Sequence, residues 1–227
     1  MNPKPTAASS QTTILIVDDH PMMREGLAQL IGQQKDMTVC GQAGSAPEAL
    51  DKVRVLKPKL VLVDITLPGR SGLELIKDIR ALQAGAAVLV ISMHDEALYA
   101  ERVLRAGGRG YVMKQEGGKK IMEAIRQVAA GQIFVSDKMS AKILEVFSGH
   151  RPTAAQTPVE SLTDREFEVF QCIGRGAGTK EMALELHVSP KTIEVHRANI
   201  KTKLKIKSMP ELIRYAVRWV ESEKQGS

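Results

Sequence analysis

Residues 14–19 read Ile-Leu-Ile-Val-Asp-Asp, so four consecutive apolar residues run directly into two carboxylates. An uninterrupted apolar run of this length is typical of a strand buried on both faces of a parallel sheet. Similar runs recur along the first half of the chain, each followed by a longer amphipathic segment. The predicted strands are Ile14–Val17, Thr38–Cys40, Leu60–Val63, Val88–Ile91 and Tyr111–Met113, and the predicted helices are Met22–Ile31, Pro47–Leu56, Leu73–Leu82, Glu96–Ala106 and Lys119–Ala130. Five such repeats predict a doubly wound α/β domain with a five-stranded parallel sheet.

The carboxyl ends of these predicted strands carry a set of polar residues. In a doubly wound sheet the strand ends lie along one edge, where such folds bind ligands. The residues placed there are Asp18, Asp19, Asp64, Ser92 and Lys114. Taken singly, each has an ordinary explanation as a loop cap, a turn residue or a surface lysine. Together, three carboxylates would repel one another, so the set favours a hard divalent cation such as Mg²⁺, with the hydroxyl and ammonium groups facing a transferred phosphoryl group.

The rest of the chain divides into a tail, a linker and a second domain. Residues 1–11 have no periodic apolar face and predict a tail, which leaves residues 12–131 as the α/β domain. Residues 132–160 predict one amphipathic helix, Ser136–Phe147, and then a linker that contains glycine and proline but few large apolar residues. Residues 161–227 have only helical periodicity, which predicts a small all-α domain.

Helix-capping signals and charge characterise this second domain. Thr163 and Glu166 have the spacing of a capping box, and Ser189 before Pro190 has the pattern of an N-cap followed by a helix-starting proline. Within Lys191–Lys207 six basic residues stand against one acidic residue. Such a charge run alone is more often a solvated helix surface, but it also suits a polyphosphate partner.

Composition restricts the class of protein. The 227 residues are 43% hydrophobic and 26% charged, with a formal net charge of +6, which excludes a disordered, collagen-like or disulfide-scaffold chain. The longest apolar runs are far shorter than the ~20 residues needed to cross a bilayer, and the start lacks the pattern of a signal peptide. Cys40 and Cys172 are isolated and predict buried thiols in a reducing compartment. We therefore expect a cytoplasmic protein with no membrane partner.

Residues 13–131 resemble a response-regulator receiver domain, and the whole chain resembles a NarL/FixJ-type two-component response regulator of bacteria. The motifs that carry the first resemblance are Val17-Asp18-Asp19-His20-Pro21, Asp64 with Pro68 and Gly72, Ile91-Ser92-Met93-His94, and Gly110-Tyr111 with Lys114. The resemblance implies that Asp64 accepts a phosphoryl group from a sensor histidine kinase. It also implies that Asp19, Asp64 and the backbone carbonyl of Thr66 bind Mg²⁺ directly and Asp18 through water. Lys114 and Ser92 would contact the phosphoryl oxygens, and Ser92 and Tyr111 would form the switch pair.

Residues 161–223 resemble a LuxR-type helix-turn-helix. The resemblance rests on Leu162-Thr163-Asp164-Arg165-Glu166, on Ser189-Pro190-Lys191-Thr192-Ile193-Glu194-Val195-His196 and on Lys203. The predicted first helix is Thr179–His187 and the predicted recognition helix is Pro190–Leu204. The resemblance places base-edge contacts at Glu194, Val195 and Ala198, and phosphate contacts at Lys191, Thr192, Lys201 and Lys203. Because a glutamate can accept a hydrogen bond from cytosine, Glu194 should read a different base from the lysine that some relatives have there.

The last helix is predicted to carry more apolar surface than a four-helix domain can bury. We therefore predict a dimer surface formed by Leu212, Tyr215, Ala216, Val217, Trp219 and Val220. The predicted protein is not an enzyme but a DNA-binding transcriptional regulator, in which phosphorylation of Asp64 promotes homodimerisation and promoter binding. RNA polymerase is a further candidate partner. Two alternatives are a phosphotransfer enzyme or metal-dependent phosphatase that uses Asp64 as a turnover nucleophile, and a regulator that works without phosphorylation.

Overall fold

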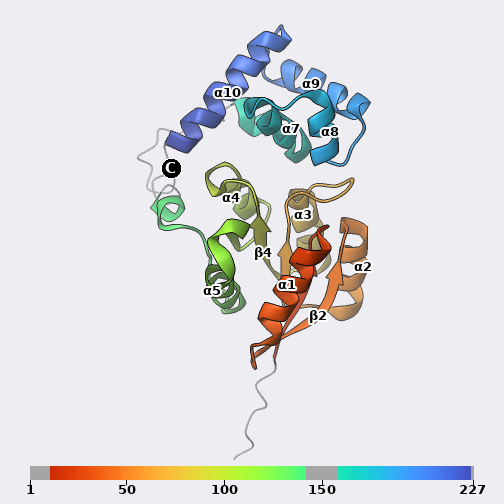
Figure 1. The fold of residues 1–227 in the computed structure, drawn as a ribbon, viewed down its shortest axis with the longest axis vertical. Coiled ribbons are helices and arrows are strands. Elements are labelled where there is room, and N and C mark those ends of the chain that lie inside the picture. The colour runs from red at the N-terminus through yellow and green to blue at the C-terminus, as the bar shows by residue number, and fades with distance from the viewer. Residues whose placement is uncertain (1–10, 142–157, 226–227) are drawn as a thin grey trace, which may run out of the picture.

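The computed structural model describes residues 11–141 and 158–225 and contains an α/β domain followed by an all-helical domain (Figure 1). Of the predicted tail and linker, residues 1–10 and 142–157 lie outside the described residues. The predicted linker helix therefore falls only partly within the structure, where residues 137–141 are helical. No helix in the described ranges is both long enough and apolar enough to cross a membrane.

Five parallel strands form the sheet of the first domain. They are β1 (Thr12–Val17), β2 (Met37–Ala43), β3 (Leu60–Val63), β4 (Ala87–Ser92) and β5 (Gly110–Met113). The spatial order is β2-β1-β3-β4-β5, and all four strand pairs are parallel. The order reverses between β1 and β3, so the site at the strand ends lies beside the point where the chain changes direction across the sheet. The predicted fold class is confirmed.

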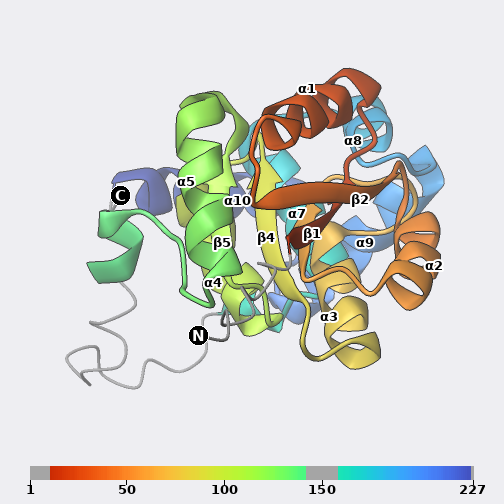
Figure 2. The same cartoon turned by 90° about the horizontal axis from the view of Figure 1, so that it is seen from below.

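Helices cover both faces of this sheet (Figure 2). They are α1 (Pro21–Gly32), α2 (Ala46–Leu56), α3 (Gly72–Leu82), α4 (Glu96–Arg105) and α5 (Gly117–Ala129). Helices α1 and α5 pack their apolar residues on one face, where Leu27 and Ile125 meet Ile16. Helices α2, α3 and α4 pack on the other face, where Val53 and Ile76 meet Val63. Both faces of the strands are buried, as the uninterrupted apolar runs predict.

The second domain contains α7 (Asp164–Gly174), α8 (Thr179–Glu185), α9 (Pro190–Lys203) and α10 (Met209–Gln225). The predicted capping box at α7 is present, because Thr163 Oγ1 accepts from the Glu166 amide and the Glu166 carboxylate accepts from the Thr163 amide. At α9 the Ser189 hydroxyl oxygen accepts from the Thr192 amide, as predicted for an N-cap. The first helix of the helix-turn-helix is shorter than predicted, since α8 ends two residues before His187.

Packing of α10 corrects one premise of the predicted dimer surface. Leu212, Ala216 and Val220 are buried inside the domain, against α7. Tyr215 and Trp219 are partly buried, and both rings contact Phe170. The domain therefore buries most of the stripe that the sequence suggested was surplus, and three of the six predicted residues are not at its surface in this arrangement.

Candidate functional site

Three charged side chains meet at the carboxyl ends of β1, β3 and β5. Lys114 Nζ lies 2.6 Å from Asp18 Oδ2 and 2.6 Å from Asp64 Oδ2. Asp18 and Asp64 are 2% and 5% exposed, so the two carboxylates share one ammonium group in a water-poor setting. Burial raises the pKa of the Asp64 carboxyl, although Lys114 opposes the shift. Burial alone would lower the pKa of Lys114, but the two carboxylates outweigh it and raise the pKa.

Asp19 extends this cluster. One potential ligand atom from each of Asp18, Asp19, His20 and Asp64 lies within 4.8 Å of the others. Asp19 Oδ1 is buried and accepts no hydrogen bond, although Nδ1 of His20 is 2.7 Å away. Several carboxylate oxygens around one point, with an acceptor that lacks a donor, form the donor set that Mg²⁺ prefers. The residues present therefore fit this cation.

Glycine is required where α3 begins, directly behind Asp64. The Gly72 amide donates to the Ile65 carbonyl at 2.7 Å, and a Cβ at position 72 would overlap the Asp64 carbonyl oxygen. The close approach holds the loop that carries Asp64 and Thr66 against the sheet edge. The Thr66 amide in turn lies 3.4 Å from Asp64 Oδ1.

Ser92 and Tyr111 lie beside the acidic cluster and are both buried. Ser92 Oγ accepts from the His94 amide at 3.2 Å, and the Tyr111 hydroxyl donates to the His94 carbonyl at 2.8 Å. The predicted switch pair is thus joined through the backbone of His94. The strand ends bring Asp18, Asp19, Asp64, Ser92 and Lys114 to one edge, as the sheet topology predicts.

Helix α9 presents the residues predicted to contact DNA. Ile193 and Ile200 are buried on its inner side, whereas Glu194, Val195 and Ala198 are exposed on its outer side. The Glu194 carboxylate accepts from Thr179 Oγ1 at 3.0 Å and from Arg197 Nη1 at 2.9 Å, so two donors fix its position. The predicted phosphate contacts Lys191 and Lys203 are exposed, and Thr192 and Lys201 are partly exposed.

One of these lysines already has a partner within the chain. Lys203 Nζ lies 2.6 Å from Glu166 Oε2, the carboxylate of the α7 capping box. Lys201 has no acidic partner within 4 Å among the residues the structure describes. The two lysines therefore differ in how readily a phosphate could recruit them.

Comparison with known families agrees with both halves of this geometry. Residues 14–126 match the response regulator receiver domain, and residues 160–216 match the bacterial regulatory proteins of the luxR family. The oxygen regulatory protein NreC of Staphylococcus haemolyticus is 34% identical over 209 residues, which cover 90% of this chain and 96% of that protein. NreC of Staphylococcus aureus is 37% identical with the same coverage. The chain belongs to this family of two-component response regulators. Its two domains are a receiver domain and a LuxR-type DNA-binding domain.

Solved structures of response regulators have the same fold. A LuxR-family two-component response regulator from an Aurantimonas species is 34% identical, with a TM-score of 0.56 over 61% of this chain and 99% of that chain. RcsB from Salmonella enterica serovar Typhimurium, bound to promoter rprA in the presence of phosphomimetic BeF₃⁻, has a TM-score of 0.60 over 92% of this chain and 99% of that chain. At 21% identity, the RcsB likeness concerns the fold alone.

The receiver domain packs against the DNA-binding domain through α7 and α10 (Figure 1). All residues from Asp164 to Ile173 are buried, including the charged ones. Arg102 of α4 makes several of the described polar contacts: its guanidinium donates to the Val159 and Leu162 carbonyls at 2.8 and 3.2 Å and lies 3.8 Å from the centroid of the Phe167 ring. It also lies 3.5 Å from Asp164 Oδ1. Lys77 of α3 also pairs with Asp164, at 2.6 Å, so both α3 and α4 hold the start of the DNA-binding domain.

A buried acid lies near the centre of the same interface. Glu168 is 1% exposed and accepts from the Ser71 hydroxyl of the receiver and from Arg165 at 2.6 Å. Burial raises the pKa of the Glu168 carboxyl, while Arg165 and Ser71 lower it. Because Ser71 also caps α3, which begins behind Asp64, the contact links the phosphoacceptor loop to α7.

His94 forms a second link between the acidic edge and the DNA-binding domain. Burial and the nearby Arg175 guanidinium lower the pKa of His94 to about 4, so its imidazole is neutral near pH 7. Arg175 Nη1 then donates to His94 Nδ1 at 3.2 Å, and His94 Nε2 donates to Thr66 Oγ1 at 2.9 Å. The His94 ring also stacks on Tyr99, with ring centroids 5.0 Å apart.

Sequence reasoning missed the interface residues Ser71, Arg102, Glu168, Arg175 and His187. None of these five has a distinctive pattern in the sequence, because each makes its contact with the other domain. Of the two cysteines, Cys172 is buried as predicted, whereas Cys40 is half-buried and its thiol donates to the Ile14 carbonyl.

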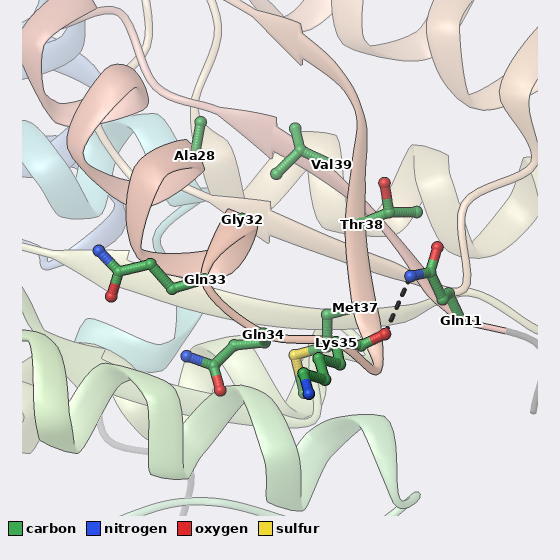
Figure 3. A pocket seen from close by; sticks show the side chains of 9 residues that line it. All are labelled: Gln11, Ala28, Gly32, Gln33, Gln34, Lys35, Met37, Thr38 and Val39. Carbon is green, nitrogen blue, oxygen red and sulfur yellow. Dashed lines mark hydrogen bonds between the residues drawn. The ribbon is translucent and has the colours of Figure 1, made fainter.

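A pocket of about 400 Å³ lies at the opposite, amino-terminal end of the strands (Figure 3). Its lining comes from the end of α1 and the start of β2, and Gln11 donates across it to the Lys35 carbonyl at 2.9 Å. Lys35 supplies the one ionisable side chain of this lining, so the pocket lacks the chemistry of the acidic edge.

Proposed function

We propose that this protein is a phosphorylation-gated transcriptional regulator whose Asp64 accepts a phosphoryl group from a sensor histidine kinase. The observation that carries the proposal is the position of Lys114 Nζ, 2.6 Å from both Asp18 and Asp64, in a chain that also presents the exposed face of α9. A phosphoryl group on Asp64 would meet the Lys114 ammonium and the Ser92 hydroxyl, which can both donate hydrogen bonds to its oxygens.

Phosphoryl transfer would proceed by attack of an Asp64 carboxylate oxygen on the phosphorus. The new O–P bond forms as the P–N bond to the kinase histidine breaks, and that electron pair returns to the imidazole ring. Asp19, Asp64 and the Thr66 carbonyl would hold Mg²⁺ directly and Asp18 would hold it through water. The cation would supply charge neutralisation for the phosphoryl oxygens. Lys114, which pairs with both carboxylates before the reaction, would move to the phosphoryl group.

DNA recognition would use the outer face of α9. Glu194, Val195 and Ala198 would face base edges, and Lys191, Thr192, Lys201 and Lys203 would contact phosphates. The donors from Thr179 and Arg197 support a role for Glu194 as a fixed hydrogen-bond acceptor, which suits a cytosine amino group.

The receiver would restrain DNA binding through its contacts with α7 and α10 rather than by covering the outer face of α9. Glu194, Val195 and Ala198 remain exposed while the receiver is docked, but α4 of the receiver contacts α10. A two-fold dimer through the exposed parts of Tyr215, Val217 and Trp219 would therefore compete with receiver docking. Phosphorylation would shift the population towards the released, dimerising form. Leu212, Ala216 and Val220 would support this surface from within.

Incubation with acetyl phosphate and Mg²⁺ tests the proposal. We expect about one phosphoryl group per chain on the wild type and none on Asp64→Asn, because an amide is not a nucleophile. Asp51→Asn, which changes an exposed aspartate, is the control. Sustained turnover of an external phosphoester would instead favour a phosphatase, and labelling of Asp64→Asn at the wild-type level would exclude Asp64 as the acceptor. Equal DNA affinity with and without phosphorylation would favour the regulator that works without it.

A further inference from the structure

Asp19 is the one predicted Mg²⁺ ligand that also contacts the DNA-binding domain in the described structure. Its Oδ2 lies 3.1 Å from Nε2 of His187, which belongs to the turn between α8 and α9. Its Oδ1 lies 2.7 Å from Nδ1 of His20. Imidazole nitrogens therefore face both oxygens of Asp19, whose side chain is only 13% exposed.

The backbone at His187 is unusual and holds the imidazole in place. His187 has a φ of 52°, in the left-handed region that favours glycine, and its amide donates to the Leu184 carbonyl at 3.2 Å. A histidine there costs backbone free energy that a glycine would not. What the histidine adds at this position is a side chain that reaches across the interface to Asp19.

Mg²⁺ and His187 both depend on the negative charge of the Asp19 carboxylate. The cation needs a carboxylate oxygen at about 2.0–2.1 Å with near-octahedral oxygen ligands around it. A neutral imidazole that donates to Oδ2 would face a weaker acceptor once the cation draws charge from the carboxylate, and a protonated imidazole would be repelled by the cation. Mg²⁺ binding therefore weakens the contact between His187 and Asp19 whether the imidazole is neutral or protonated.

We propose that Mg²⁺ and the His187 turn compete for Asp19, so that metal binding by itself weakens docking of the DNA-binding domain before any phosphoryl transfer. The proposal rests on the Mg²⁺ site of the proposed function. Because coupling between two binding equilibria is reciprocal, docking lowers the Mg²⁺ affinity by the same factor. The closed form thereby holds the acidic site in a state less ready for phosphorylation.

The test is a calorimetric Mg²⁺ titration of the unphosphorylated full-length chain. His187→Gly removes the imidazole and suits the left-handed backbone, and His187→Asn is a second variant that tolerates the same backbone. We expect both variants to bind Mg²⁺ about two- to fivefold more tightly than the wild type, the range expected for a partly exposed ion pair. Lys205→Gly, a change at another left-handed position (φ 56°) that is exposed at the end of α9, should leave the affinity unchanged.

Domain docking is followed in the same samples through Trp219, the single tryptophan of the chain. Its ring contacts Phe167, which in turn contacts Tyr99 of the receiver, so opening should change its fluorescence. We expect Mg²⁺ to change the emission of the wild type and to lose that effect in both His187 variants. Circular dichroism checks that each variant is folded.

Asp19→Asn separates the two levels of inference. If Asp19→Asn weakens Mg²⁺ binding but both His187 variants match the wild type in affinity and emission, the competition is wrong and the proposed metal site stands. If Asp19→Asn binds Mg²⁺ as the wild type does, the proposed site and the competition both fail.

Discussion

At the scale of single residues, the buried charge of Asp64 lowers the stability of the folded protein. Burial raises the pKa of its carboxyl above the ordinary 3.8, so the folded state binds a proton more tightly than the unfolded state. The charged form therefore costs stability, and this cost appears as the pH rises from 3.8 through the raised pKa. We predict that Asp64→Asn raises the free energy of unfolding by about 1 kcal/mol at pH 7, because the neutral amide avoids the cost of burying a charge.

The stability difference between Asp64→Asn and the wild type should depend on pH. The advantage of Asp64→Asn should shrink as the pH falls through the raised pKa of the wild-type carboxyl towards the ordinary 3.8. Urea unfolding at several pH values measures it, with the exposed Asp51→Asn as the control that should stay within about 0.5 kcal/mol of the wild type. A variant less stable than the wild type at pH 7 would contradict a net burial cost at Asp64.

The cluster of side chains at the strand ends could be predicted because the sheet topology alone places these residues at one edge. Asp18, Asp64 and Lys114 end three parallel strands, so their meeting needs no knowledge of side-chain packing. The contact between Asp19 and His187 could not be predicted in this way. It joins residues on two domains, and the positions of those domains depend on the packing of α7 as a whole.

At the scale of single elements, α9 divides its lysines into two kinds. Lys201→Ala should weaken binding to all DNA sequences alike and reduce the slope of log affinity against log salt by about one counterion. Lys203→Ala should reduce the slope less, because Lys203 must first leave Glu166. Filter binding at four salt concentrations measures both slopes, with Lys120→Ala on α5 of the receiver as the control. A changed sequence preference in Lys201→Ala, with an unchanged slope, would contradict this division.

Helix α10 shows why element-level prediction was only partly correct. Periodicity identified the apolar stripe correctly, and Leu212, Ala216 and Val220 are buried as a helix face should be. The pattern does not say what covers the stripe, and α7 covers most of it. The burial of charged residues in α7 could not be read from the pattern either. Glu168 and Arg165 are buried at the interface, where they pair with each other and Glu168 also accepts from Ser71 of the receiver.

At the scale of the whole molecule, the docked arrangement depends on a few polar anchors around α7. Arg102 makes two backbone hydrogen bonds, an ion pair with Asp164 and a cation–π contact with Phe167. Its side chain is 18% exposed, so water screens these contacts only in part. By contrast, Arg105 on the same helix is 57% exposed and lies 3.4 Å from Glu160 across the interface. The two arginines are thus a matched pair of a buried and a peripheral contact.

We predict that Arg102→Ala raises the DNA affinity of the unphosphorylated protein about tenfold, since losing about 1.4 kcal/mol of docking free energy releases that much more of the open form. Phosphorylation should then add little further affinity. Arg105→Ala should behave as the wild type within about twofold, because exposed ion pairs contribute little. Fluorescence anisotropy with one operator at one salt concentration measures all three proteins in both phosphorylation states. If Arg102→Ala is folded and gains no affinity while phosphorylation still activates it, the interface around α7 does not restrain DNA binding, and phosphorylation must act through dimerisation alone.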